Sequence, residues 1–274
     1  MKRVSLVLVM LTACADEPAL VRQARMSELV GSLSRAFLKS VEAEKSAVLA
    51  ITDDESERFA AESRAAARQV DALVTELRAL IDRDGRPGER EKLSVFSATW
   101  AKVAAIDARL LPLAVANTNL KAAHRSTHEA TRALERLLGA LTELEARARD
   151  PVVIRRLAAA AVAALTIQTL HAPHIASPDE AEMRELEARI QTLEGKVDEA
   201  LKAEAPGPKR EEALLAWHEY QAETTEILRL SRLNTNVLSF SLSVHEKRDA
   251  TVTAEVALQA LVIEVQTSGP RPTR

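Results

Sequence analysis

Four of the six histidines in this sequence fall in two closely spaced pairs, and histidine is a common ligand of transition metals. His171 and His174 lie three positions apart, so a helix through them would place both imidazoles on one face. His124 and His128, four positions apart, would share a face in the same way. A zinc site uses three or four ligands, and no acidic or cysteine cluster is spaced to complete either pair. We therefore expect no metal or other cofactor; a metal role for His171 and His174 is the alternative.

Asparagine supplies a second candidate site, because the tripeptide Asn-Thr-Asn occurs twice. The asparagines are Asn117, Asn119, Asn234 and Asn236. Asparagine is favoured at helix caps and turns, which explains these residues without any ligand. Pro112 and Pro173 are predicted near the same end of the helices, where proline frees backbone carbonyl groups. A widened helical end lined by asparagine would admit a small polar ligand, which is the alternative to capping.

Lys45 is a third candidate, because it interrupts an otherwise apolar helical stripe that includes Val41 and Val48. A lysine in such a stripe reaches a carboxylate across a helical bundle, or extends its ammonium group to solvent. We expect one of these structural roles, and anchoring a ligand is the alternative.

The sequence carries no recognisable enzyme motif. It has no phosphate-binding glycine loop, no nucleophile elbow and no His-Glu-x-x-His segment. The formal net charge of −3 is spread along predicted helices in mixed signs, and aromatic residues make up 3% of the chain. Nucleic-acid binding uses basic surfaces and aromatic stacking. We therefore expect a protein that is not an enzyme and does not bind nucleic acid.

The N-terminus is organised like a secretion signal. Lys2 and Arg3 precede an apolar run over residues 4–11, and small residues lead to Cys14, the single cysteine. This arrangement resembles a bacterial lipoprotein signal, in which the cysteine is lipidated and becomes the first mature residue. The run is too short to span a bilayer, and no later stretch of spanning length is expected. The prediction is a lipid-anchored, periplasm-facing protein of the cell envelope, on the inner or outer membrane; an ordinary secretion signal is the alternative.

One segment of the chain is repeated. Trp100–Asn119 and Trp217–Asn236 each begin with tryptophan, continue with a leucine-rich helical stripe and end with Asn-Thr-Asn. The correspondence extends into Ser-x-His-Glu segments at 126–129 and 243–246, which we interpret as a local cap or kink. A constant offset over this distance indicates an internal duplication.

Apolar residues recur at steps of three and four through most of the chain, which predicts amphipathic helices. The expected helices cover 21–51, 54–83, a third segment ending near 117, 120–149, 151–176, 178–204, 208–233 and 237–266. Ending the third helix at Asn117 and not at Ser126 gives nearly equal lengths, which favours a chain reversal there. The expected fold is all-α, with two tandem up-down antiparallel four-helix bundles at 15–149 and 150–266. A signal peptide at 1–14 precedes them and a disordered tail at 267–274 follows.

Three polar segments resemble the periplasmic sensor domain of bacterial methyl-accepting chemotaxis receptors. They are Glu44–Leu49, Thr52–Ser56 and Asn117–Ala122. Both predicted bundles are similar to that domain, which in its family is an extracytoplasmic four-helix bundle that senses ligands as a dimer. The resemblance therefore implies a tandem pair of sensory modules. The receptor's flanking transmembrane helices and signalling region are not expected here, and no motif carries over its ligand-contacting residues.

The first functional hypothesis is a lipid-anchored sensory, ligand-binding or protein-interaction module. It would capture a small molecule or act through a membrane signalling or envelope protein. The alternative is a structural envelope lipoprotein, a helical scaffold or spacer whose faces dock other proteins. A third hypothesis is a metal-handling bundle that uses the histidines.

Overall fold

The computed structural model describes residues 17–267, and every regular element in that range is helical, which confirms the all-α prediction. The helices are α2 (Glu17–Leu49), α3 (Asp53–Asp84), α4 (Pro87–Ala116), α5 (Thr118–Arg125), α6 (Thr131–Arg147), α7 (Pro151–Ala176), α8 (Glu180–Lys202), α9 (Pro208–Leu233), α10 (Thr235–Leu242) and α11 (Arg248–Thr267). Two π-helical turns, η1 (Ser126–Ala130) and η2 (Ser243–Lys247), interrupt the helical segments. The predicted signal peptide with Cys14, and the tail after Thr267, lie outside the described residues.

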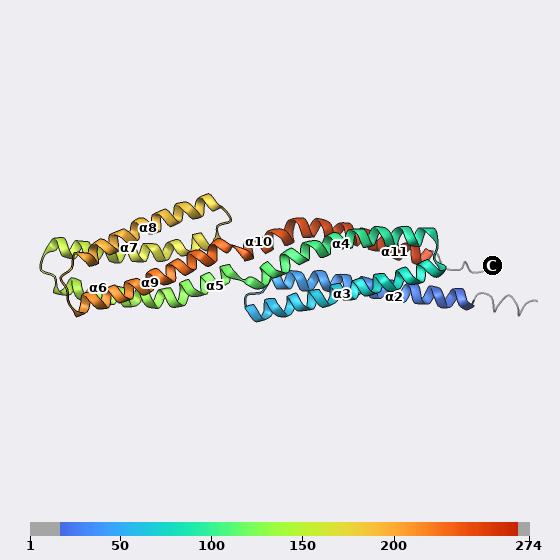
Figure 1. Cartoon of the computed structure of the whole chain (residues 1–274), viewed down its shortest axis with the longest axis horizontal. Helices are drawn as coiled ribbons and strands as arrows, with labels where there is room; N and C mark the ends of the chain where they lie inside the picture. Colours follow the sequence, from blue (N-terminus) through green and yellow to red (C-terminus); the bar gives the residue numbers. More distant parts are fainter. Residues whose placement is uncertain (1–16, 268–274) are drawn as a thin grey trace, which may run out of the picture. The chain divides into compact units, whose positions relative to one another are not determined.

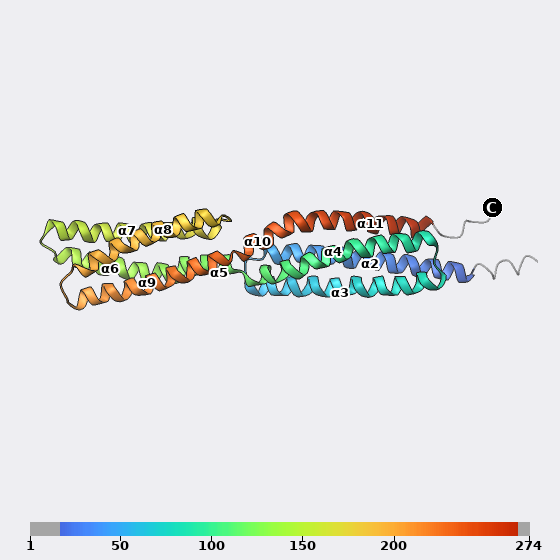
Figure 2. The ribbon, with the colours of Figure 1, turned by 45° about the horizontal axis from the view of Figure 1, so that its top comes forward.

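Among the described residues, unit 1 combines 17–115 with 239–267. Figures 1 and 2 show its helices α2, α3, α4 and α11 side by side. Phe37 packs edge-on against Phe96 and Trp100 in its core, with ring centroids 6.2 and 5.9 Å apart. Trp100 Nε1 donates a hydrogen bond to Asp71 Oδ1 at 2.8 Å, which joins α4 to α3.

Unit 2 comprises Ala116–Leu238. The continuous leg α5–η1–α6 packs with α7 and α9, and α8 completes the bundle (Figure 1). Trp217 and Tyr220 supply its large core rings, with centroids 6.0 Å apart. Trp217 Nε1 donates to Asp198 Oδ1 at 2.7 Å and joins α9 to α8, so each unit has a tryptophan–aspartate bond between the helices that bear its groove.

The division of the chain corrects the predicted domain boundary at 149–150. The leg α5–η1–α6 precedes that boundary but packs in unit 2, and α11 ends the second repeat but packs against α2 in unit 1. Each repeat therefore contributes three helices to one unit and its fourth helical leg to the other. The bundles are built from duplicated repeats whose fourth legs are exchanged, so the two predicted tandem segments do not correspond to the two units.

The exchange follows from the backbone at the two Asn-Thr-Asn segments. Asn117 and Asn234 adopt left-handed conformations with φ of 50°, which asparagine tolerates better than most residues. Each is the only non-helical residue between two helices. Helical hairpins need a loop of about two to five residues, as residues 50–52 provide between α2 and α3. A single non-helical residue is shorter than such a loop, which is why the hairpin predicted at Asn117 from equal helix lengths does not form.

Short polar caps fix the start of the true hairpin helices. Thr52 Oγ1 accepts a hydrogen bond from the Glu55 amide at 3.3 Å and caps the start of α3. Asp150 Oδ1 accepts from the Val152 amide at 2.8 Å, with proline at the first helical position of α7. Both contacts lie where the chain turns within one unit.

Each fourth leg contains a π-helical turn at the same place in the repeat. The two Ser-x-His-Glu segments fall in these turns, so they mark a helix irregularity as expected. A π turn leaves a backbone carbonyl without its usual partner. In unit 2, Gln168 Nε2 donates to the Ser126 carbonyl at 2.8 Å and Thr131 Oγ1 donates to it at 3.0 Å. In unit 1 the turn ends at Lys247, whose side chain is buried.

Among the described helices, α7 alone is long and apolar enough to cross a membrane by length and composition. No stretch of that length and composition was expected after the N-terminus. The alanine-rich composition of α7 serves close packing, since Leu157, Ala160, Ala164 and Ile167 all lie in the core of unit 2. Its inward face is therefore part of a helical bundle.

Candidate functional site

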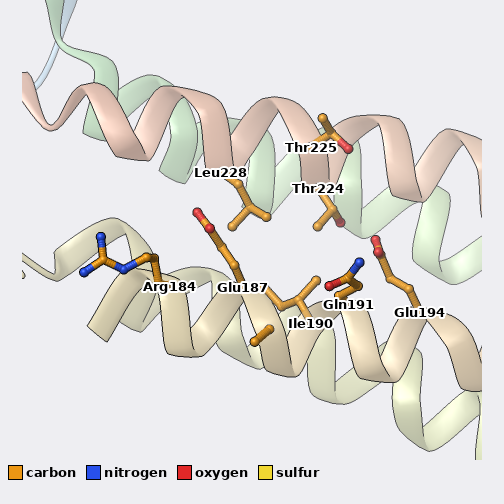
Figure 3. A pocket seen from close by; sticks show the side chains of 9 residues that line it. Arg184, Glu187, Ile190, Gln191, Glu194, Thr224, Thr225 and Leu228 are labelled. Carbon is orange, nitrogen blue, oxygen red and sulfur yellow. The ribbon is translucent and has the colours of Figure 1, made fainter. Parts of the chain in front are cut away.

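The two units carry a groove at the same position, between the second and third helices of each repeat. The groove of unit 1 lies between α3 and α4 and has a volume of about 340 Å³. The groove of unit 2 lies between α8 and α9 and has a volume of about 560 Å³ (Figure 3). Asp107 lines the first and Thr224 the second, and they are related by the 117-residue offset that also separates Thr118 from Thr235. The duplication has thus produced two versions of one surface feature.

The groove of unit 1 has a basic rim. Arg64 and Arg68 extend from α3, while Asp107 and Leu111 line it from α4. Both arginines are exposed. Asp107 is 6% exposed, and the exposed Asp71 accepts the hydrogen bond from Trp100 Nε1, so the two arginines outnumber the accessible carboxylate in this groove.

The groove of unit 2 is lined by acidic and neutral polar groups. α8 presents Glu187, Gln191 and Glu194 toward α9 at helical spacing (Figure 3). Thr224 faces them from α9; it is 1% exposed, and its hydroxyl has no hydrogen-bond partner among residues 17–267. Burial, reinforced by the nearby charge of Asp198, raises the pKa of Glu194. The arrangement favours groups that donate hydrogen bonds or carry positive charge.

A polar cluster closes one end of this groove and joins three helices. Glu187 of α8 accepts hydrogen bonds from Arg232 Nε and Nη2 of α9 at 2.6 and 2.7 Å. His174 of α7 donates from Nε2 to the same carboxylate at 3.0 Å, and its Nδ1 lies 2.8 Å from Ser231 Oγ. The hydrogen bond from Arg232 is the main cause of the lowered pKa of Glu187. Glu187 is therefore an anion held by cationic and polar groups.

His171 lies in the core of unit 2, as the sequence predicts. Its Nδ1 is 3.1 Å from Ser126 Oγ, and its Nε2 has no hydrogen-bond partner among the described residues. Burial, with a smaller effect from His174, lowers the pKa of His171 to about 4, so the ring is neutral at pH 7. The described part of the chain contains no group of three metal-ligating side chains around either histidine. A metal role for His171 and His174 stays the untested alternative to the expectation of no metal.

Unit 1 holds a charged trio in its core: Glu44 on α2, Asp107 on α4 and Lys247 at the end of η2. Lys247 donates to Asp107 and lies 3.8 Å from Glu44. Asp107 Oδ2 and both Glu44 oxygens lack a partner with hydrogen-bond geometry, although the Ser243 hydroxyl lies near Glu44. Burial raises the pKa of both carboxyl groups, and the charge of Lys247 opposes that rise. The trio is thus an incompletely satisfied ion network.

The four predicted asparagines are brought together in one network within unit 2. Asn119 Nδ2 donates to the Ile175 carbonyl at 2.7 Å and to Asn234 Oδ1 at 2.9 Å. Asn234 Nδ2 donates to the Ser177 carbonyl at 3.1 Å. These contacts satisfy carbonyl groups at the C-terminal end of α7.

The two chain crossings also cap each other. The Thr118 amide donates to Thr235 Oγ1 at 3.1 Å, and the Thr235 amide donates to Thr118 Oγ1 at 3.2 Å. Asn119 and Asn236 exchange amide-to-side-chain bonds in the same reciprocal way, at 3.1 and 3.2 Å. Each segment thus satisfies the free N–H groups of the other's new helix. The asparagines have a structural role, and ligand binding by them stays a prediction.

Lys45 and the paired surface histidines lie outside these sites. Lys45 is exposed, so it extends to solvent as one of its two predicted structural roles requires. The charged residue that enters the core is its neighbour Glu44. His124 and His128 stack on the surface, with ring centroids 4.2 Å apart.

Neither the charged trio nor the two grooves were predicted from the sequence. A signal for the trio was present. Asp107 occupies a stripe position between Val103 and Leu110, and Lys247 precedes Ala254 by two helical turns on the inward face of the fourth leg. A charged residue at an apolar stripe position predicts a buried partner, but the partner is found only when the exchanged leg is placed.

Comparisons with known proteins support the fold. No protein-family model matches the chain, and no curated protein matches it. Among solved structures, the chain is similar to the sensor domain of the histidine kinase sensor TorS from V. parahaemolyticus. The TM-score is 0.60 at 13% sequence identity, and the alignment covers 89% of this chain and 100% of that one. This chain therefore has the helical-bundle fold of a histidine kinase sensor domain.

Proposed function

We propose that the chain is an extracytoplasmic sensory module that binds a small ligand and passes its effect to a partner protein. The observation that carries the proposal is the fold shared with a histidine kinase sensor domain over 89% of this chain. The duplicated groove, whose unit 2 version has a buried hydroxyl without a partner, supports a ligand-binding role for the bundle surface.

The arrangement of unit 2 supports a way for a ligand to act. The groove lies between α8 and α9, and Glu187 at its end is bound by Arg232 of α9 and His174 of α7. A ligand that moves α8 relative to α9 would therefore also change the hydrogen bond from His174 of α7 to Glu187. Helix shifts of about 1–2 Å are a common form of signalling change.

The N-terminal sequence supports placing the module at a membrane outside the cytoplasm. We propose that Cys14 carries the lipid anchor and that the described bundles face the periplasm. A membrane signalling or envelope protein would then read the state of the bundles. The resemblance of three polar segments to the sensor domain of chemotaxis receptors supports the same proposal.

A ligand screen that reads the two units separately tests this function. Trp100 belongs to unit 1 and Trp217 to unit 2, and the sequence has no other tryptophan. In a Trp100→Phe variant, fluorescence-monitored unfolding reports unit 2; in a Trp217→Phe variant it reports unit 1. We expect a ligand that stabilises unit 2, by about 2.7 kcal/mol at one hundred times its dissociation constant.

The opposite outcome would favour a structural protein. A broad library that stabilises neither unit, together with recovery of envelope proteins bound to the native chain, would support the scaffold or spacer function. The anchor is checked separately: the mass of the native N-terminus should show a lipidated Cys14, and a native chain that retains Met1 would exclude it.

A further inference from the structure

Three polar groups converge in the unit 2 groove. Figure 3 shows the Thr224 hydroxyl, the Gln191 amide and the Glu194 carboxylate pointing toward the same space. Gln191 and Glu194 lie three positions apart on α8, so both project from one face, and Thr224 approaches them from α9. These three residues are called the acceptor cluster.

Thr224 provides the first sign that a ligand belongs there. Its side chain is 1% exposed, and its hydroxyl has no hydrogen-bond partner among the described residues. The Tyr220 hydroxyl lies nearby, and the Thr224 hydroxyl partly offsets the rise that burial causes in the pKa of Tyr220. The two hydroxyls do not meet hydrogen-bond geometry, and the Tyr220 hydroxyl donates to Gln168 Oε1 at 3.1 Å. A buried hydroxyl without a hydrogen-bond partner is unfavourable. One left open on the wall of a groove indicates a position for a ligand atom.

Glu194 provides the second sign, because its charge is not matched. No ion pair to Glu194 is found among residues 17–267, whereas both arginines near the groove are engaged. Arg184 lies 3.3 Å from Glu180 and sits at the opposite end of the groove in Figure 3. Arg232 is bound to Glu187. The groove therefore contains one carboxylate that an added cation would pair.

We infer that the acceptor cluster binds a small organic cation through a primary ammonium group. Such a group carries three N–H donors, which match the Thr224 hydroxyl oxygen, the Glu194 carboxylate and, once the amide group of Gln191 is turned over, the Gln191 side-chain carbonyl. Ile190 and Leu228 line the same groove and offer contact for a short carbon chain. The inference rests on the proposed sensory function for its biological meaning, whereas the binding chemistry follows from the groove itself.

The unit 1 groove supplies a control within the same chain. Arg64 lies as far from the start of α3 as Gln191 lies from the start of α8, so the two are equivalent positions. Arg64 and Arg68 repel a cation where Gln191 and Glu194 attract one. Ligand-induced changes should therefore be confined to unit 2.

Calorimetric and NMR titration of the full chain tests the inference with ethylammonium and 1,4-diaminobutane as primary ammonium probes. Tetramethylammonium, acetate and magnesium chloride serve as comparisons. We expect saturable binding of the primary ammonium ions, with shifts at Thr224 and Gln191 and none at Ala104 or Ala108 in the unit 1 groove. Glu194→Gln should weaken binding about tenfold or more, because it removes a charge-assisted hydrogen bond.

Two further variants separate binding from folding. Thr224→Val should weaken binding several-fold while leaving the free protein as stable or more stable, because an unsatisfied hydroxyl is removed. Glu199→Gln, the same change at an exposed α8 residue outside the groove, should leave affinity unchanged. An affinity for the primary ammonium ions that neither Glu194→Gln nor Thr224→Val changes would overturn the inference. So would equal binding of tetramethylammonium, tighter binding of magnesium, or no saturable binding of either amine.

The inference and the proposed function fail in different ways. A screen hit that stabilises unit 2 without displacing or resembling an ammonium ion would reject the ligand class and leave the sensory function standing. Ammonium binding at the acceptor cluster that produces no change in any partner's activity would keep the site and reject the sensory function.

Discussion

Units 1 and 2 share one helical plan but fill an equivalent core position with different chemistry. The corresponding pairs, matched by helix ends and by the repeat offset, are Glu44 with His171, Asp107 with Thr224, and Lys247 with Ala130. Unit 1 places three charges there, while unit 2 places a neutral imidazole, a hydroxyl and a methyl group. The ion network makes unit 1 depend on one lysine, whereas the neutral version leaves a hydroxyl facing the groove. The duplication thus preserved the helical scaffold, and in unit 2 it left a hydroxyl without a partner, that of Thr224, on the wall of the groove.

The largest expected effect is the loss of Lys247. Lys247→Met leaves Glu44 and Asp107 buried without a cation, and breaking a buried pair in this way costs about 3–5 kcal/mol. Urea unfolding of unit 1, followed by Trp100 in a Trp217→Phe background, measures the change. Lys102→Met removes an exposed lysine from α4 and should cost far less. Equal effects of the two changes would show that the trio does not stabilise unit 1.

The next effect is a pH dependence confined to unit 2. The pKa of His171 is about 4 in the folded protein and about 6.5 when unfolded, so the unfolded state binds more protons between these values. The contribution of the neutral His171 to the free energy of unfolding of unit 2 is therefore fully present above about pH 6.5. It falls by about 3 kcal/mol as the pH approaches 4. Trp217 fluorescence in a Trp100→Phe background follows this loss. His171→Gln, which cannot titrate, should flatten the profile over that range; an unchanged profile would assign it to other groups.

A smaller effect of opposite sign is expected at Glu44. Its raised folded pKa means that the folded protein favours the protonated carboxyl, so stability falls as the pH rises above the unfolded value of about 4.3. Glu44→Gln mimics the protonated form and should stabilise unit 1 at pH 7 by about 1 kcal/mol. The gain should shrink on acidification through that value. Destabilisation at pH 7 would show that the Glu44 charge is needed by Lys247.

The smallest effect should be the same in both units. Asp71→Ala and Asp198→Ala each remove the acceptor of a tryptophan N–H bond, at 2.8 and 2.7 Å respectively. Each should cost about 1 kcal/mol, the usual contribution of one hydrogen bond. Unfolding curves of the two variants, each read from its own tryptophan, give the comparison. A clear difference between the two losses of stability would mean that the tryptophan–aspartate hydrogen bond stabilises the two bundles to different extents.

Local features of the fold were predictable because local residues determine them. Thr52 and the Asp150–Pro151 pair specify helix starts by their own chemistry, and the repeat is visible from the two tryptophans. The assignment of the fourth legs was not predictable from periodicity, since an apolar stripe packs equally well in either bundle. Which unit each fourth leg joins depends on the left-handed conformations of Asn117 and Asn234. It also depends on the reciprocal hydrogen bonds between the two Asn-Thr-Asn segments.

The candidate site was less accessible to sequence reasoning than the fold. The acceptor cluster joins Gln191 and Glu194 to Thr224 on another helix, and polar residues of α8 at such spacing look like any solvated face. What distinguishes Thr224 is a buried hydroxyl without a partner, a property of packing that no single-chain pattern displays. His171 and His174 were recognised as inward-facing because they continue an alanine-rich stripe.

The most direct test of the exchanged-leg fold is to express two fragments and compare them. Residues 116–238 contain all the helices of unit 2, whereas residues 150–266 contain the second repeat as it occurs in the sequence. The account predicts that 116–238 is a monomer that unfolds cooperatively with a buried Trp217, and that 150–266 is not. A cooperatively folded monomer of 150–266, with 116–238 unfolded, would contradict it.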